Sequence, residues 1–447
     1  MTFNPLVHTQ SLCPICLRSV EAFIVQEGDE AFMLKTCLEH GAFETIVWRG
    51  KTPMHEWVRT KERAFINHPI TPIEKGCPFD CGLCSAHRQH TCTALIEVTK
   101  RCNLKCRFCF ADALDAPNED PSLEQLRFQF ESILKVSGAC NIQLSGGEPS
   151  VRNDLDAIVR MGREIGFSFI QLNTNGIRLA QDEAYVKSLK EAGLSSVFLQ
   201  FDGVDDAIYR QLRGRALFEL KCRAIENCKK YGIGVVLVPT IVPKINDAHI
   251  GEIIRFGIRR SPTVRGVHFQ PVSYFGRIPN PPKDDDRITL PEVMDAICEQ
   301  TDGMVTLGSL QPPGCENALC SFNGNYLIEE GVLKPVTKRT ACCSKESEKA
   351  EVGAIKAKAF VARNWSYQKQ VETEMLSDWD TILSAIHNNT FSLSGMAFQD
   401  VWNVNLERIR DCCIHVSTMD GKLIPFCIYN LTNTKGESLY RDAKGLA

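Results

Sequence analysis

The sequence lacks any long hydrophobic run, although 44% of its 447 residues are hydrophobic. No apolar stretch approaches the roughly 20 residues that a membrane-spanning helix needs, and the N-terminus lacks the pattern of a signal peptide. The chain also lacks a strong charge of either sign, since its net charge of −3 argues against non-specific nucleic-acid binding. These absences predict a cytoplasmic protein with no membrane span, long enough for one large core and one or two smaller modules.

Cysteine, by contrast, is abundant, with 21 residues that occur in groups. The cytosol keeps thiols reduced, so metal ligation rather than a disulfide framework is the expected use. The most informative group is Cys102, Cys106 and Cys109, which follows the apolar run 94–99. Three thiolates at this spacing can hold three irons of a 4Fe–4S cluster and leave the fourth iron open. A zinc knuckle is the alternative, but it requires four ligands and no histidine is near in sequence.

The N-terminal segment carries a different pattern of metal ligands. Cys13 and Cys16 form one knuckle, and Cys37 and His40 form a second one after two strand-like segments. This spacing predicts a zinc-ribbon or rubredoxin-like site with a structural role, holding zinc or mononuclear iron. The alternative is an incomplete site in which His40 is exposed at the surface.

Four cysteines within sixteen residues come next, separated by glycine and proline. They predict a complete auxiliary 4Fe–4S cluster. Zinc is the alternative, with His87 and His90 as further ligands. We favour iron and sulfide because this segment leads directly into the strand before Cys102 and can relay electrons to it. The four cysteines are Cys77, Cys81, Cys84 and Cys92.

From residue 94 onward, apolar strands alternate with amphipathic helices. This alternation predicts an α/β fold with a parallel sheet and right-handed crossovers. Six units suit a partial (β/α)6 barrel with functional residues at the C-terminal ends of its strands. The predicted strands are 94–99, 141–145, 167–173, 196–201, 234–240 and 266–271, and the predicted helices include 122–136, 154–165, 183–192, 216–231 and 249–256.

Polar residues and glycines follow these predicted strands. Gly146 and Gly147 let the backbone approach a ligand, and Glu148 can accept a hydrogen bond from the ligand's ammonium group. The later strands end in groups suited to a ribose, to nucleoside hydroxyls and to an adenine. Each signal alone is weak, because such residues also occur in plain turns, but together they predict a nucleoside cofactor site. The candidate residues are Phe108, Ser145, Gly146, Gly147, Glu148, Asn173, Asn175, Gln200, Asp202, Thr240 and Gln270.

The C-terminal third differs in composition and carries further thiols. A largely helical segment is expected over about 350–410. Four of these cysteines could bind a further iron–sulfur cluster if the fold brings them together. The alternative is that they are buried or unpaired thiols. The four candidate ligands are Cys315, Cys320, Cys413 and Cys427.

With these motifs in view, the chain resembles the radical S-adenosylmethionine (radical SAM) family of the archaeal tetraether lipid synthase and its bacterial relatives. The likeness covers nearly the whole chain and rests on CPIC…CLEHG, GCPFDCGLCSAHRQHTC, IEVTKRCNLKCRFCFA, LSGGEPSVR, QLNTNGIRLA, LQFDGVDD, VHFQPVSYFGR and CCIHVSTMDGKLIPFCIYN. It implies a rubredoxin-like metal site, one or two auxiliary clusters and a cluster that binds S-adenosylmethionine. The regions expected are a ribbon module (1–70), an auxiliary-cluster segment (71–93), the barrel (94–295) and a C-terminal α+β auxiliary-cluster domain (296–447).

The expected catalytic group is the cluster of Cys102, Cys106 and Cys109. It would cleave S-adenosylmethionine reductively, and the resulting 5′-deoxyadenosyl radical would abstract hydrogen from an unactivated carbon. The resemblance implies carbon–carbon joining on a lipid, hence a small-molecule or lipid substrate and an electron donor such as flavodoxin or ferredoxin.

Two alternatives remain open at this point. One is transfer of a 3-amino-3-carboxypropyl group to a thiophilic acceptor such as trivalent arsenic, suggested by the vicinal pairs Cys342-Cys343 and Cys412-Cys413. The other is a non-catalytic iron–sulfur electron carrier, which would have no use for an open cluster backed by a cofactor-binding barrel.

Overall fold

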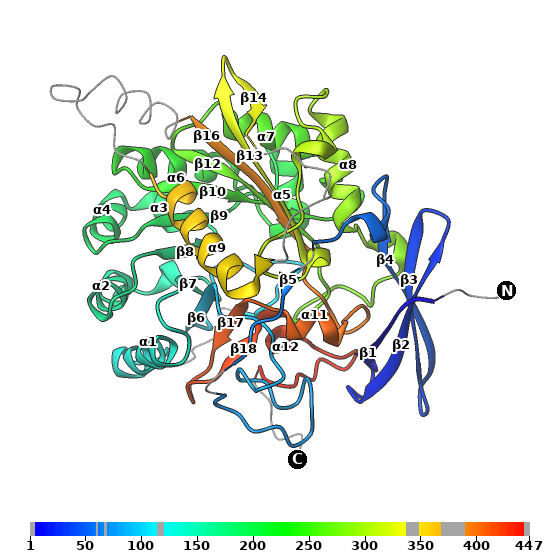
Figure 1. Ribbon diagram of the computed structural model, residues 1–447. Coiled ribbons are helices and arrows are strands. Elements are labelled where there is room, and N and C mark those ends of the chain that lie inside the picture. Colours follow the sequence, from blue (N-terminus) through cyan, green and yellow to red (C-terminus); the bar gives the residue numbers. More distant parts are fainter. Residues whose placement is uncertain are drawn as a thin grey trace.

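The computed structural model describes residues 5–59, 61–66, 69–113, 120–336, 348–367 and 389–441. Residues 5–49, which are all described, form a four-stranded antiparallel sheet at the edge of the molecule (Figure 1, blue). Its strands are β1 (Pro5–Leu12), β2 (Ser19–Glu27), β3 (Glu30–Cys37) and β4 (Gly41–Arg49). Burial alternates along β3, which is the pattern of a sheet with one face packed and one face solvated.

The main sheet contains twelve strands within the described ranges, in the order β14-β13-β16-β12-β10-β9-β8-β7-β6-β17-β18, with β11 beside β12. The six predicted strands are present at its centre and run parallel, which confirms the predicted α/β fold. They are β6 (Thr93–Thr99), β7 (Asn141–Gly146), β8 (Ile170–Thr174), β9 (Ser196–Gln200), β10 (Gly234–Val238), continued by β11 (Thr240–Ile241), and β12 (Val264–Pro271).

Helices cover the outer side of this sheet (Figure 1). The first, α1 (Leu123–Ser137), begins at a capping box in which the Ser122 side chain accepts from the backbone of Gln125. Its buried stripe of Leu126, Phe130 and Ile133 packs into the core. The other outer helices are α2 (Leu155–Ile165), α3 (Ile177–Gln181), α4 (Glu183–Glu191), α6 (Phe218–Lys230), α7 (Ile250–Ile258) and α8 (Leu290–Gln300). α5 (Asp206–Arg213) instead packs against the loop after β6, where the backbone N–H of Arg107 donates to the carbonyl of Leu212.

The C-terminal part extends the main sheet on both sides. β16 (Thr390–Met396) pairs in parallel with β12, and β17 (Ile414–Ser417) pairs in parallel with β6. The expectation of a largely helical segment over 350–410 holds for α9 (Ala350–Trp365) and is wrong for β16. Phe391 and Leu393 are buried in the core there, and the segment pairs with β12 on one side and with β13 on the other.

The remaining elements, apart from the nine-residue β13, are short. The strands are β5 (Lys61–Glu62), β13 (Ser321–Glu329), β14 (Val332–Pro335), β15 (Glu348–Lys349) and β18 (Leu423–Pro425), and the helices are α11 (Leu406–Arg410) and α12 (Phe426–Asn430). Single 3-10 turns are η1 (Met54–Glu56), η2 (Pro149–Val151), η3 (Asp247–His249), η4 (Asp284–Asp286), η5 (Leu307–Ser309) and η6 (Ala318–Cys320). None of the helices in the described ranges combines the length and apolarity that crossing a bilayer demands.

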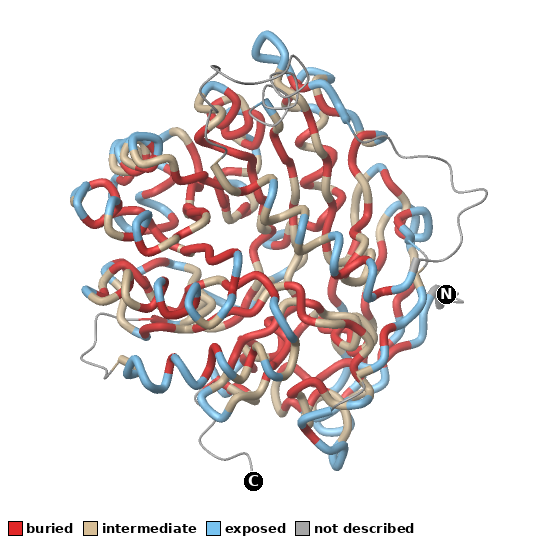
Figure 2. Tube along the Cα trace, turned by 60° about the vertical axis from the view of Figure 1, so that its left-hand side comes forward, coloured by how far each residue is buried: buried red, intermediate tan, exposed pale blue. Residues whose placement is uncertain are grey.

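The central strands are buried along most of their length (Figure 2). Every residue of β10 is buried, as are all residues of β9 except the last. Outer helices cover one side of the sheet, while α9 lies on the inner side against β10, β12 and β16. Burial on both faces explains why these strands are continuous apolar runs in the sequence.

A buried ion pair joins the segment after β16 to the loop before α8. The guanidinium of Arg287 donates to both carboxylate oxygens of Asp400 at 2.9 and 3.1 Å. Asp400 has no exposed surface, and Arg287 is 5% exposed. Nearby, Lys35 of β3 donates to the carbonyl of Val401 at 2.7 Å. This network holds the N-terminal sheet against the main body.

We expect Asp400→Asn to lower the free energy of unfolding by about 3–5 kcal/mol, because the Arg287 guanidinium would stay buried without its counter-charge. Urea unfolding followed by circular dichroism measures the loss. Glu299→Gln removes the partner of the exposed Lys51 and should leave the unfolding midpoint almost unchanged. Similar midpoints for the two variants would contradict the stabilising role of the buried pair.

Candidate active site and metal sites

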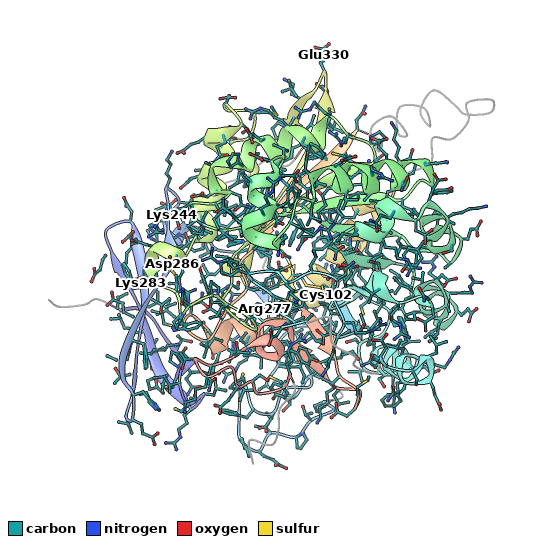
Figure 3. All side chains as sticks on the ribbon, turned by 180° about the vertical axis from the view of Figure 1, so that it is seen from behind. Cys102, Lys244, Arg277, Lys283, Asp286 and Glu330 are labelled. Carbon is teal, nitrogen blue, oxygen red and sulfur yellow. A yellow bond between two sulfur atoms is a disulfide. The ribbon has the colours of Figure 1, made fainter. Side chains whose placement is uncertain are left out.

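The three cysteines of the predicted cluster loop lie beyond the end of β6. Cys102, Cys106 and Cys109 all line one cavity of about 700 Å³ on the inner side of the sheet. The backbones of Cys109 and Arg277 exchange two hydrogen bonds of 3.0 and 2.9 Å, and Nε of Arg277 donates to the carbonyl of Cys106 at 3.0 Å. Figure 3 shows Cys102 and Arg277 near the middle of the molecule. The loop is therefore fixed on a second segment distant in sequence.

The paired glycines after β7 allow this loop to pack closely. A Cβ on Gly146 would lie 2.2 Å from the carbonyl oxygen of Thr99, and one on Gly147 would lie 2.2 Å from that of Arg101. The N–H groups of Gly147 and Glu148 donate to these same carbonyls at 2.8 Å. Both glycines line the cavity. Because they have no side chains, the cluster loop can lie directly against the end of β7.

Glu148 is 2% exposed and joins the ends of two strands. Its Oε1 accepts from the hydroxyls of Ser150 and Thr174 at 2.6 Å, and its Oε2 accepts from the backbone N–H of Asn175 at 2.6 Å. The carboxylate thus stands at the cavity wall with its orientation fixed by the chain itself.

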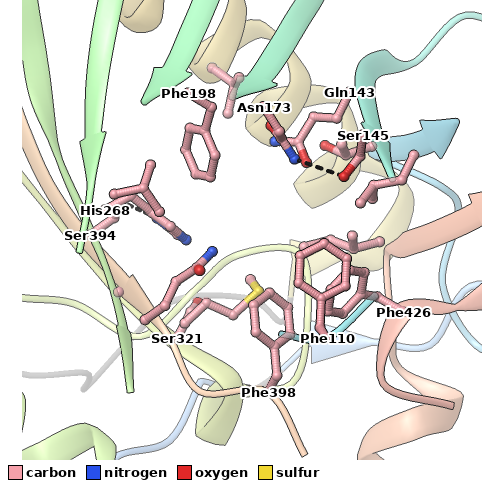
Figure 4. Close-up of a pocket in the computed structure, with 18 of the residues that line it drawn as sticks. Phe110, Gln143, Ser145, Asn173, Phe198, His268, Ser321, Ser394, Phe398 and Phe426 are labelled. Carbon is pink, nitrogen blue, oxygen red and sulfur yellow. Dashed lines mark hydrogen bonds between the residues drawn. The ribbon is translucent and has the colours of Figure 1, made fainter. Parts of the chain in front are cut away.

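Asn173 offers an unused acceptor to the cavity. Its Nδ2 donates to Ser145 Oγ at 3.5 Å (Figure 4), whereas its buried Oδ1 has no partner among the described residues. Buried polar atoms are nearly always hydrogen-bonded in native proteins. The ammonium and ribose hydroxyls of S-adenosylmethionine supply such donors, so these residues and the three thiols fit the implied cofactor and cluster.

The other predicted cofactor residues divide into two sets. Phe108, Asn175, Gln200, Thr240 and Gln270 line the cavity together with those above. Asp202 instead is fully buried, and its two carboxylate oxygens each accept from Arg213 at 2.7 Å.

Two basic residues of the site gave no signal in the sequence. Arg213, at the end of α5, lines the cavity and also donates to Thr240 Oγ1 at 3.1 Å. Lys221 of α6 is fully buried and donates to the carbonyl of Asn175 at 2.5 Å. Both stand in amphipathic helices, where a basic residue is ordinarily solvated, so only the structure reveals them.

The N-terminal sheet brings its four predicted ligands together. The ligand atoms of Cys13, Cys16, Cys37 and His40 all lie within 4.8 Å of one another. Nδ1 of His40 is 3.4 Å from Cys37 Sγ and 3.6 Å from Cys13 Sγ. Three thiols and one imidazole are a set that binds zinc tetrahedrally.

The structure groups the remaining cysteines differently from the sequence prediction. The sulfur atoms of Cys92, Cys315 and Cys413 lie within 4.8 Å of one another, with Cys92 and Cys315 joined as a disulfide. All three line the same cavity as the cluster loop. The backbone N–H of Cys92 donates to the carbonyl of Cys413 at 2.8 Å, because β17 pairs with β6 just beyond this point.

The other thiols of the predicted sets lie elsewhere. Cys77, Cys81 and Cys84 surround a separate small pocket. Burial, together with the neighbouring thiols of Cys427 and Cys320, raises the pKa of Cys412. Cys413, by contrast, lies with Cys92 and Cys315. Cys342-Cys343 lies outside the described residues.

The chain is similar to several known proteins. Residues 96–257 match the radical SAM superfamily, and residues 5–49 match the HMPTM N-terminal zinc ribbon domain. The 7,8-dihydro-6-hydroxymethylpterin dimethyltransferase of Methanocaldococcus jannaschii is 35% identical over 94% of this chain and 93% of its own. The probable GTP 3',8-cyclase of Archaeoglobus fulgidus is 33% identical over 36% of this chain and 53% of its own. Streptococcus suis SuiB bound to S-adenosylmethionine aligns with a TM-score of 0.36 and 17% identity, covering 44% of this chain and 45% of that one.

Replacement of Cys37 by Ser should remove about one metal equivalent per chain, because a tetrahedral site loses one of its four ligands. Elemental analysis of zinc and iron measures the loss. Labile sulfide should not change, since a mononuclear site contains none. Cys222→Ser on α6 is the control, and a fall in sulfide with C37S would contradict the assignment.

Asn173→Ala should weaken S-adenosylmethionine binding by about 3- to 10-fold, the effect of losing one hydrogen bond. Equilibrium dialysis on the reconstituted protein gives the Kd. Asn227→Ala is the matched control, because that side chain donates to the carbonyl of Leu179 on α3. Unchanged affinity in N173A would show that Oδ1 does not face the cofactor.

Proposed function

Since the chain belongs to the radical SAM superfamily and to the family of the Methanocaldococcus jannaschii dimethyltransferase, we propose that it abstracts hydrogen from an unactivated carbon of a largely apolar substrate. The observation that carries this proposal is one cavity lined by the cluster-loop thiols and by several aromatic side chains, which together we call the aromatic wall. A bound 4Fe–4S cluster with S-adenosylmethionine supplies the 5′-deoxyadenosyl radical for this chemistry.

The residues of the chain have separate roles in this proposal. Cys102, Cys106 and Cys109 hold the cluster, while Asn173 accepts from the polar groups of the cofactor. Glu148 keeps the ends of β7 and β8 in place and lends its charge to an ammonium group. Gly146, Gly147, Asn175, Gln200, Thr240 and Gln270 complete the cofactor wall, Phe108 covers the loop, and Asp202 acts through Arg213.

The aromatic wall favours an apolar substrate. A carbon radical is quenched by stray hydrogen donors, so the reaction needs a site from which water is excluded. Hydrocarbon chains fill such a wall without leaving polar groups unpaired. Carbon–carbon joining between lipid-like chains is the finer form of the proposal. The aromatic lining residues are Phe108, Phe110, Phe198, Phe275, Phe322, Phe360, Phe398, Phe426 and Trp365.

A second redox group is proposed at the same cavity. Once a reductant has opened the Cys92–Cys315 bond, the thiolates of Cys92, Cys315 and Cys413 would hold an auxiliary cluster there, which would supply a redox group beside the substrate. Cys77, Cys81 and Cys84 are the candidate ligands of a further cluster, and the N-terminal site takes zinc or mononuclear iron. The proposal includes four regions of the chain: 1–70, 71–93, 94–295 and 296–447. It also includes a flavodoxin or ferredoxin as the reductant.

Methylation of a pterin is the second candidate. It is favoured by the relative of that name, which is similar over nearly the whole chain, and by aromatic side chains on which a flat ring can stack. Transfer of an aminocarboxypropyl group to arsenic has less support. Within the described residues Cys413 lies with Cys92 and Cys315, whereas Cys412 lies near Cys427 and Cys320. A pure electron carrier would not use the cavity.

The test is anaerobic. The protein is reconstituted with iron and sulfide, reduced with dithionite in the presence of S-adenosylmethionine, and its products are identified by mass spectrometry. We expect 5′-deoxyadenosine from the natural sequence and from Cys228→Ala, a buried thiol of the helical layer, but at least 100-fold less from Cys106→Ala, which loses a cluster ligand.

Other products discriminate the alternatives. A methylated product from added 7,8-dihydro-6-hydroxymethylpterin would select the pterin candidate. Methylthioadenosine would point to aminocarboxypropyl transfer. Intact S-adenosylmethionine beside a fully loaded cluster would overturn the proposal.

A further inference from the structure

A row of polar side chains crosses the wall of the cavity formed by β12, β16 and β13. The sheet register places His268 of β12 opposite Ser394 of β16, and Ser394 opposite Asn323 of β13. Residues paired in this way share one face of a sheet, and all three line the cavity. The row is therefore set by the pairing of three strands.

His268 is held in one orientation. Its Nδ1 lies 2.8 Å from Ser394 Oγ. Its ring contacts Phe198 and Trp365, with centroids 5.3 and 5.9 Å away. His268 is buried, with 8% of its surface exposed. Its Nε2 has no hydrogen-bond partner within the described ranges. Burial lowers the pKa of His268 to about 4, so the ring is neutral at pH 7.

The cavity thus has two polar ends. Figure 4 shows Asn173 and Ser145 at one end, His268 and Ser394 at the other, and Phe198 between them. The first end belongs to the proposed cofactor site. The second end has no role in that site, and a polar group in an apolar wall costs free energy unless a partner binds it.

We propose that His268, Ser394 and Asn323 form a subsite for one uncharged hydrogen-bonding group of the substrate, such as a hydroxyl or a carbonyl. The row itself carries no charge, since the basic side chains of the cavity come from other elements: Arg59 from the segment before β5, Arg213 from α5, and Lys356 and Arg363 from α9. This inference rests on the proposed function and deepens it. Binding the polar group at one end presents a carbon of the apolar part to the cofactor end.

Specificity follows from the same row. A hydrocarbon without a polar group would leave Nε2 of His268 unpaired, and sites built to bind a polar group discriminate strongly against analogues that lack it. His268 is therefore a specificity-determining residue in this proposal, with Ser394 as the positioning residue that fixes its ring.

The test compares two probes of similar size, 1-hexanol and 1-chlorohexane, on the full-length reconstituted protein. Quenching of tryptophan fluorescence reports binding, because Trp365 lies beside His268. His268→Phe should weaken 1-hexanol binding by about 3- to 10-fold, the effect of one hydrogen bond, and leave 1-chlorohexane binding unchanged. Ser394→Ala, a smaller change that keeps the strand, should act in the same direction.

Met396→Leu is the control, because Met396 lines the same cavity from the same strand. It should change the binding of both probes by the same factor. Equal losses for both probes in H268F and S394A, or no loss in either, would overturn the subsite. So would the absence of any binding to the natural sequence. Release of 5′-deoxyadenosine is measured on the same samples, so failure of the subsite and failure of the radical chemistry are distinguishable.

Discussion

The close approach of two backbones organises the whole site. The carbonyls of Thr99 and Arg101 accept from the N–H groups of Gly147 and Glu148. The backbones are so close that neither Gly146 nor Gly147 has room for a Cβ. This contact decides where Cys102, Cys106 and Cys109 stand relative to the strand ends. Glu148 extends the constraint to β8 through Thr174 and Asn175. A displaced loop would separate the thiols from every polar group predicted to meet the cofactor.

A single cavity then connects parts of the molecule that are distant in sequence. The cluster loop, the group of Cys92, Cys315 and Cys413, the aromatic wall and the row at His268 all face it. A substrate held there would have a radical source, a candidate redox partner and a polar anchor around it. The C-terminal strands of the main sheet contribute to two of these features. Cys413 directly precedes β17, and Ser394 of β16 belongs to the row at His268.

Local sequence patterns predicted the central strands and the ligands of the N-terminal metal site. Contacts between segments distant in sequence could not be predicted in this way. The six central strands follow from apolar runs that are buried on both faces, and the zinc-ribbon ligands follow from knuckles in short turns. The sequence could not pair Cys92 with Cys315, because 223 residues separate them and only the folded sheet joins them. Arg213 and Lys221 stand on amphipathic helices where charge is unremarkable. The strand 390–396 was expected to be helix, because its register depends on a neighbour far away in the chain.

The pairing of β17 with β6, in which Val416 lies beside Leu95, also bears on biosynthesis. A chain emerging from the ribosome completes β6 long before its partner is made, so the β6 edge of the central sheet remains open until β17 is synthesised. Cys413 arrives with that same strand. The group of Cys92, Cys315 and Cys413 is therefore completed only after β17 has been synthesised and has paired with β6.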